Sequence, residues 1–407
     1  MLFIAIAITL AALYFVQMKV YKKRTFDKLG YKVSLDSSEV TVGDDIYMFE
    51  ELTNDKAMPL PYIKISTNLP VGLAFRLVKN ENGRLSDAFM GSVESIFVLK
   101  GRQRIRRRWR IACRKRGIYS LGNATVVSND LIGFNPISTV LRVPKSKTTT
   151  VTVLPAQAEL ERDFSSTDCF AGDILVKKSL LTDPMLRSGA RDYTPFDPMN
   201  RINWKLSASH GKLLVNVEEY VTKFQSNVIL NMCSQIIERS EDTPDNPEFI
   251  EYNITVAASL IGRLAAENSP VRLIANTPPE TIHEDYRAGS DETGSKIMMT
   301  PPFTGKYGVL DAMRTLATLE MKYSMPVEKM LDYVYDHPSV FSENGNIVLV
   351  TSVIDGRMTL FYEQMKRLGI DVIFYVTTSN RGIDRIPDGM KVFYRTYFDS
   401  YKAVGQW

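Results

Sequence analysis

Cysteine and histidine are both scarce in this chain, which has three of each among its 407 residues. The cysteines lie far apart and show no C-x-x-C or C-x-x-H spacing, so the sequence predicts neither a disulfide framework nor a zinc site. The histidines are too few for a metal cluster, and each is expected to be a surface or capping residue. No G-x-S-x-G elbow is present, and no buried strand precedes the phosphate-loop-like stretch 289–296. The sequence therefore predicts no catalytic residue, no metal and no cofactor.

A large charge of one sign is also missing. The 50 basic and 46 acidic residues leave a formal net charge of +4, which is too small to attract nucleic acid to the whole molecule. The apolar fraction of 44% is ordinary for a packed globular protein, and the length leaves room for two or three domains.

The chain does have one long apolar run, at its N-terminus. Residues 1–18 carry no charge and would span about 27 Å as a helix, close to the thickness of the hydrocarbon core of a bilayer. Lys19, Lys22, Lys23 and Arg24 follow at once, whereas a cleaved signal peptide has its positive charge before the apolar run. We therefore expect residues 1–21 to be a transmembrane anchor of the cell membrane, with the bulk of the chain on the cytoplasmic side.

Residues 29–155 are predicted to form an all-β, sandwich-like domain. Short stretches of alternating polar and apolar residues are separated by turn residues, as at 31–35, 40–42, 46–52 and 63–67. No helical stripe of useful length interrupts them.

A run of basic residues without an acid occupies 100–116 in this domain. Apolar residues at 105, 109 and 111 alternate with arginines, which predicts a strand with one packed face and one basic, solvated face. Three interpretations stay open: a solvated basic face of the strand, a surface for anionic lipid or an acidic partner, and, least favoured, a nucleic-acid surface. The candidate basic residues are Arg104, Arg106, Arg108 and Arg110.

The spacing of apolar residues changes in residues 226–400, where helical patterns alternate with short apolar runs. A helix is predicted from Asn246 to about Glu267, because a capping residue, a proline in the first turn and an acid at the positive end all coincide. Alternation of helices and buried strands predicts a parallel, doubly wound α/β sheet. The expected strands lie at 227–232, 271–275, 346–351 and 370–376, and the expected further helices at 310–321, 327–335 and 358–368.

The connector between the two domains, residues 156–225, holds the least ordinary stretch of the chain. Residues 191–219 mix prolines, arginines, acids and a tryptophan, and Pro195 and Pro198 exclude a continuous helix. The order of Arg-x-Tyr, a Pro-x-Asp turn, an arginine before Trp-Lys, a small-residue step and a Glu-rich strand resembles the signature of the domain-of-unknown-function-58 family. The matching positions are Arg191, Tyr193, Pro195, Asp197, Arg201, Trp204, Lys205, Ser207, Ala208 and Glu218.

This resemblance implies a von Willebrand factor A-like fold for residues 226–400. Such domains commonly bind a divalent cation after their first strand through Asp-x-Ser-x-Ser and later Thr and Asp residues. The corresponding positions here are Asn231, Cys233 and Gln235, with Ser352 after a later strand. Since an amide and a thiol are poor Mg²⁺ ligands, the resemblance implies a degenerate metal site. Whether Asp355 replaces the missing carboxylate is left open.

The resemblance also implies a cytoplasmic partner, a MoxR-type AAA+ ATPase. The predicted function is a membrane-anchored, non-catalytic interaction scaffold that acts with this ATPase in the assembly or maturation of other complexes. The alternative is metal-dependent ligand binding or hydrolysis by the C-terminal domain. In the signature, Arg191, Asp197, Arg201 and Trp204 are predicted to form one paired cluster that either docks the connector onto the C-terminal domain or binds a partner.

Overall fold

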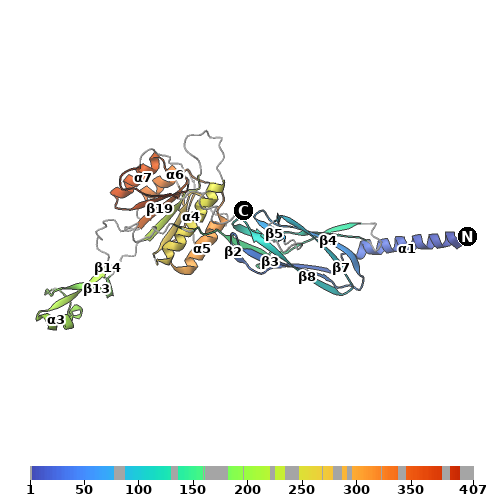
Figure 1. Cartoon of the computed structure of the whole chain (residues 1–407), viewed down its shortest axis with the longest axis horizontal. Coiled ribbons are helices and arrows are strands. Elements are labelled where there is room, and N and C mark those ends of the chain that lie inside the picture. Colours follow the sequence, from blue (N-terminus) through green and yellow to red (C-terminus); the bar gives the residue numbers. More distant parts are fainter. Residues whose placement is uncertain are drawn as a thin grey trace. The chain divides into compact units, whose positions relative to one another are not determined.

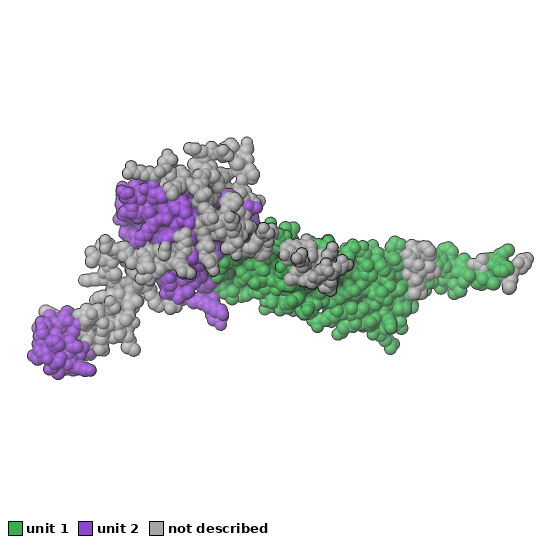
Figure 2. Space-filling view, in the orientation of Figure 1, with its two compact units in different colours: residues 1–157, 279–281, 310–319 green, residues 158–278, 282–309, 320–407 purple. Residues whose placement is uncertain are grey.

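The structure is a computed structural model, and it falls into two compact units that Figure 2 colours separately. Unit 1 comprises residues 1–157, 279–281 and 310–319, and unit 2 comprises residues 158–278, 282–309 and 320–407. The residues that the structure describes are 2–77, 88–129, 136–158, 160, 182–195, 197–220, 225–233, 247–267, 269–277, 287–290, 296–321, 323–337, 345–377 and 386–394.

Unit 1 begins with helix α1, Leu2–Arg24 (Figure 1). The C-terminal end of α1 contacts the segment that joins the third and fourth strands of the same unit: Tyr21 is only 4% exposed, and its hydroxyl donates to the carbonyl oxygen of Pro59 at 3.1 Å. The Lys56 ammonium donates to the carbonyl oxygens of Arg24 and Thr25. Lys56 therefore places a positive charge at the negative end of the helix, where carbonyl groups lack intrahelical partners.

The predicted transmembrane anchor at residues 1–21 is wrong. Within the described part of the chain, no helix is long and apolar enough to cross a membrane. In the last turns of α1, Tyr21 is buried, whereas the basic residues 19 and 22–24 are exposed. The predicted fold class and the single-pass localisation, with the bulk of the chain on the cytoplasmic side, are wrong in the same respect. The chain is mostly β-sheet with a few helices.

The β-strands of unit 1 alternate buried and exposed positions because each sheet has one face in the core. In the described residues they form sheets in the orders β1-β3-β8-β5-β6, β11-β10-β4-β7 and β2-β12-β9. The strands are β1 (Leu29–Leu35), β2 (Glu39–Thr41), β3 (Asp45–Asn54), β4 (Leu60–Asn68), β5 (Leu73–Leu77), β6 (Ala88–Met90), β7 (Ser92–Leu99), β8 (Gln103–Cys113), β9 (Gly117–Ser120), β10 (Ala124–Ser128), β11 (Ile137–Leu141) and β12 (Thr150–Leu154). The described side chains of the interior include two apolar clusters, one around Met48 and Phe75 and the other around Leu52 and Ile65.

Helix α5, Gly305–Thr318, has residues in both units. Those up to 309 belong to unit 2, and those from 310 onward belong to unit 1. The buried guanidinium of Arg116 donates to the carbonyl oxygens of Leu316 and Leu319 at 2.8 and 2.9 Å. These are the unpaired carbonyl groups that end a helix, so Arg116 caps α5. Gly117 follows Arg116 with a φ of 147°, a conformation that side chains with a Cβ rarely adopt.

Unit 2 holds a mixed seven-stranded sheet among its described residues, in the order β17-β18-β16-β15-β19-β20-β21. Strands β16, β15, β19, β20 and β21 run parallel, whereas β17 and β18 are antiparallel to their neighbours, so the sheet is not the all-parallel one that the sequence predicted. The strands are β15 (Gln225–Leu230), β16 (Val271–Ala275), β17 (Arg287–Ser290), β18 (Lys296–Met299), β19 (Gly345–Thr351), β20 (Val372–Val376) and β21 (Lys391–Tyr394).

Among the residues that the structure describes, three helices cover this sheet. Helices α6 (Val327–Asp336) and α7 (Gly356–Arg367) share an apolar cluster with one face of the strands, while α4 (Pro247–Ala266) contacts β15, β16 and β19 from the other side (Figure 1). The central strands are buried on both faces because helices lie on both, which explains their continuous apolar sequences. Unit 2 also contains a separate hairpin, formed by β13 (Thr182–Asp192) and β14 (Leu214–Tyr220).

Candidate functional site

The signature residues lie on the hairpin of residues 182–220. Those from Arg191 to Ala208 are at the end where β13 and β14 are joined, whereas Glu218 lies further along β14, opposite Arg187. The joining segment contains the short 3-10 helix η1 (Met199–Arg201) and helix α3 (Trp204–His210). The Asn203 side chain caps α3 by accepting from the amide of Leu206 at 3.1 Å, and Gly211 ends it with a φ of 66°. Ile202 and Val215 form a small buried centre under these turns. The local sequence thus contains its own start and stop signals.

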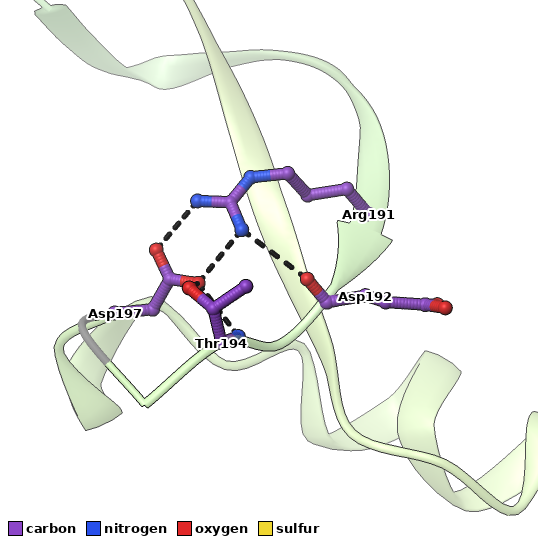
Figure 3. Close-up of polar contacts among 4 residues, drawn as sticks. All are labelled: Arg191, Asp192, Thr194 and Asp197. Atoms are coloured by element: carbon purple, nitrogen blue, oxygen red, sulfur yellow. Dashed lines mark hydrogen bonds and ion pairs between the residues drawn. The ribbon is translucent and has the colours of Figure 1, made fainter.

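A network around Asp197 closes the turn between β13 and η1 (Figure 3). Arg191 donates from Nη1 to Asp197 Oδ2 at 2.7 Å and from Nη2 to Asp197 Oδ1 at 2.5 Å, which is a two-pronged ion pair. The backbone amide and the hydroxyl of Thr194 also donate to Asp197 Oδ2, at 2.9 and 2.7 Å. Hydrogen bonds from Arg191 first, and from Thr194 next, hold the pKa of the Asp197 carboxyl well below its usual range.

Only part of the predicted signature cluster is present among the described side chains. Arg191 pairs with Asp197, but Trp204 is 62% exposed, and no guanidinium of the described residues lies over its ring. The Arg201 side chain and all of Phe196 lie outside the described residues. The remaining predicted positions, Tyr193, Pro195 and Lys205, are half-buried or exposed.

Exposed apolar side chains gather on the same short segment as Trp204. A segment this small has room for few residues in its centre, so large apolar groups remain at its surface. They are Met199, Trp204, Leu206 and Leu213.

A second polar cluster lies at the carboxyl ends of the central strands of unit 2, where the degenerate metal site was predicted. Asn231 is its centre: Oδ1 accepts from the amide of Cys233 at 3.0 Å and from Nδ2 of Asn276 at 3.4 Å. Asn231 Nδ2 donates to the hydroxyl oxygen of Thr351 at 3.2 Å, and Asn253 Nδ2 donates to Ser352 Oγ at 3.0 Å. All these side chains except Cys233 are buried. We call this set the Asn231 network.

The Asn231 network does not fit a divalent cation. The potential metal ligands of the network are amide and hydroxyl groups, and the side-chain oxygen of Asn231 already accepts two hydrogen bonds. Within the described residues, no three His, Cys, Asp or Glu side chains come together as a metal site. Gln235, the third predicted position, lies outside them.

Asp355 has a structural use of its own beside this network. Its carboxylate Oδ1 accepts from the amide of Met358 at 2.8 Å and so caps helix α7. Burial raises the pKa of Asp355 above its ordinary value.

The basic strand is β8, and its pairing with β3 determines what the arginines contact. Arg108 lies over the ring of Tyr47, with 4.6 Å from Cζ to the ring centroid, and Arg106 lies over Phe49 at 4.3 Å. At one end of this row Arg110 pairs with Asp45 at 2.5 Å. At the other end Arg104 lies 3.5 Å from Glu51. We call these four pairs the arginine ladder.

The arginines of this ladder were predictable from the sequence, but their partners were not. Each partner lies on β3 two positions away from the residue directly opposite the arginine; Phe49, for example, is directly opposite Arg108 yet stacks with Arg106. The alternation of residues 45, 47, 49 and 51 was a visible signal for an outward face. The register that joins the two strands was not.

Comparisons with known proteins add no family. No family model matches the chain, and no curated protein matches it. Among solved structures, a CARDB domain from Pyrococcus furiosus in complex with di-metal ions is 17% identical, with a TM-score of 0.19 over 31% of this chain and 96% of that one. A non-cellulosomal cohesin from Archaeoglobus fulgidus is 13% identical, with a TM-score of 0.19 over 29% of this chain and 92% of that one. Part of an alpha-2-macroglobulin from Escherichia coli is 11% identical, with a TM-score of 0.21 over 29% of this chain and 24% of that one. TM-scores this low carry no argument about function.

Proposed function

We propose that this chain is a non-catalytic protein-interaction scaffold, and that the hairpin of residues 182–220 binds a MoxR-type AAA+ ATPase during assembly or maturation of other complexes. The observation that supports the proposal is the exposed Trp204 on a segment whose turn is fixed by the Arg191–Asp197 pair. The ATPase partner rests on the resemblance of the signature residues to the domain-of-unknown-function-58 family.

An exposed tryptophan favours binding for two physical reasons. Its ring removes a large apolar area from water when a partner covers it, and tryptophan is enriched among the residues that contribute most to interfaces. Met199, Leu206 and Leu213 add apolar surface on the same segment. Since the turn beside them is already held by four hydrogen bonds to Asp197, little conformational entropy would be lost there on binding.

A direct binding measurement tests this proposal. The full chain is immobilised and titrated with the MoxR-type ATPase of the same organism, with and without a non-hydrolysable ATP analogue. We expect saturable binding, and we expect Trp204→Ala to weaken it at least about tenfold, the size of loss that an interface hot spot produces.

Tyr307→Ala is the matched control for this experiment. Tyr307 is an 85% exposed aromatic residue of unit 2 outside the hairpin, so its removal should leave the affinity unchanged. Both variants should keep the melting temperature of the unchanged protein, because neither ring is buried. Absence of binding in both nucleotide states, or equal affinities for the two variants, would contradict the proposal.

A further inference from the structure

The arginine ladder leaves two cations on the outer face of unit 1 without an acidic partner in the described part of the chain. Arg104 and Arg110 are beside Glu51 and Asp45, and Arg76 pairs with Asp45 as well, at 2.6 Å. Arg106 and Arg108, between them, are exposed and contact only aromatic rings among the described interactions. The uncompensated positive charge of the ladder is therefore concentrated at its centre.

The two aromatic rings hold these guanidinium groups in place. Tyr47 and Phe49 are half-buried on the sheet, so each arginine lies against a ring that packing fixes. A stacked guanidinium keeps its N–H groups at the edge of its plane, where they can pair with a carboxylate through two parallel hydrogen bonds. Two such groups are therefore positioned before any ligand arrives.

Their spacing is set by the strand. Arg106 and Arg108 are two residues apart on one face of β8, which places their Cα atoms about 7 Å apart. Side chains at alternate positions of any extended peptide have the same repeat and point to the same side. An extended segment with acids at two alternate positions would present one carboxylate to each guanidinium.

We infer that Arg106 and Arg108 bind an extended acidic segment of a partner protein, with Asp or Glu at alternate positions. This surface lies in unit 1 and is separate from the hairpin of residues 182–220, so it goes beyond the proposed function. A nucleic acid or an anionic lipid surface fits less well. Both offer many negative charges in succession, whereas the arginines next to the central pair are already beside Asp45 and Glu51.

A pair of peptides with one composition tests the inference on the full chain. One fluorescent peptide alternates aspartate with threonine, and the other carries the same residues with the aspartates in one block. At low ionic strength we expect the alternating peptide to bind at least about threefold more tightly than the block peptide. Added salt should weaken binding of the alternating peptide. Equal affinities of the two peptides would overturn the inference. So would tighter binding of single-stranded DNA or of phosphatidylserine vesicles than of the alternating peptide.

Three double variants separate charge from geometry. Arg106→Gln with Arg108→Gln should weaken binding of the alternating peptide at least about tenfold, since both cations that would pair with its carboxylates are lost. Arg106→Lys with Arg108→Lys keeps the charge but removes the planar guanidinium groups that donate two parallel hydrogen bonds. This variant should bind the alternating peptide severalfold more weakly. Lys145→Gln with Lys147→Gln removes the same charge from exposed positions of unit 1 and should leave the affinity within about twofold.

All of these positions are exposed, so the variants should fold, which a thermal melt of each verifies. If the glutamine pair binds as the unchanged protein does, or if the control pair weakens binding equally, the ladder is not the site.

Discussion

The Asn231 network and the turn that Arg191, Thr194 and Asp197 close, here called the Asp197 turn, are built from polar side chains. They differ in where their hydrogen bonds lie. The Asn231 network is buried and joins β15, α4 and β19. The Asp197 turn is a local arrangement of neighbouring residues at the surface, beside an exposed tryptophan. The first holds distant parts of unit 2 together, whereas the second shapes a surface.

This difference shows why residue type alone is a poor guide to a binding site. A buried amide whose nitrogen and oxygen atoms are both hydrogen-bonded contributes to stability and is not exposed to a ligand. An exposed ion pair contributes little to global stability, but it can fix the geometry of a loop.

The largest effect is expected from Asn231→Ala. The substitution removes the hydrogen bonds that join the Asn231 side chain to Cys233, Asn276 and Thr351. Because these bonds lie in the interior of unit 2, their loss should lower the free energy of unfolding by about 2–4 kcal/mol. Urea denaturation followed by circular dichroism measures this loss. Asn200→Ala removes an exposed asparagine from the hairpin and should change stability by less than about 0.5 kcal/mol. Equal losses in the two variants would remove the contrast between buried and exposed amides.

A somewhat smaller loss is expected from Arg116→Ala, about 2 kcal/mol, because it removes a buried charged donor from the carbonyl groups at the end of α5. Arg142→Ala, at an exposed position of the same unit, is the control and should be nearly neutral. Thermal melts of the two variants provide the comparison. A melting temperature for Arg116→Ala that matches the control would show that the cap contributes nothing.

The Asp197 turn should respond differently, with a local effect and almost no global one. Asp197→Asn keeps the size and shape of the side chain but removes the negative charge of the carboxylate to which Arg191 and Thr194 donate. We expect the amide of Thr194 to exchange with solvent about threefold to tenfold faster, while the melting temperature hardly changes. Hydrogen exchange by NMR measures the first quantity. A large fall in melting temperature would show that the turn is a part of the core.

The smallest effects are expected on acid titration, and they have opposite signs at the two acids. The pKa of Asp197 is lowered by its hydrogen bonds, so its stabilising contribution is present above the pKa of an unfolded aspartate, about 3.9, and is lost as the pH falls through the folded value. The pKa of Asp355 is raised by burial, so its contribution is complete below the unfolded pKa and is lost as the pH rises through the folded value.

NMR titration of the two carboxyl carbons checks these signs. Asp197 should titrate below about 3.9 and Asp355 above it. The Asp355→Asn variant retains a capping side chain, so relative to the unchanged protein it should gain stability toward neutral pH. Coinciding titration midpoints for the two acids would contradict the assigned environments.

Local signals were enough to predict some elements. The predicted helix at 246–267 corresponds to α4 at Pro247–Ala266, since its proline, acid and apolar stripe all lie within the helix itself. The basic strand was also visible, because the alternation that produces β8 is a property of one segment. The start and stop of α3, in contrast, depend on Asn203 and Gly211, which the composition of the signature did not single out.

Features that depend on distant partners were not predictable. The apolar N-terminus was interpreted as a membrane span because hydropathy does not show that Tyr21 packs against Pro59 or that Lys56 reaches the helix end. The Asn231 network draws on residues more than a hundred positions apart. The predicted contact between Trp204 and an arginine assumed that neighbours in sequence face each other, and the ring is exposed instead.

The cap that Arg116 places on α5 has a consequence for synthesis of the chain. Its acceptor carbonyls lie 200 to 203 positions further along the sequence, so they leave the ribosome long after the arginine does. At roughly 5 to 20 residues synthesised per second the delay is roughly 10 to 40 s, much longer than most small domains need to fold. Unit 1 is therefore completed only when residues 310–319, which follow most of unit 2 in the sequence, have been synthesised. A fragment that stops at residue 157 would never receive that helix, and no single cut separates the two units intact.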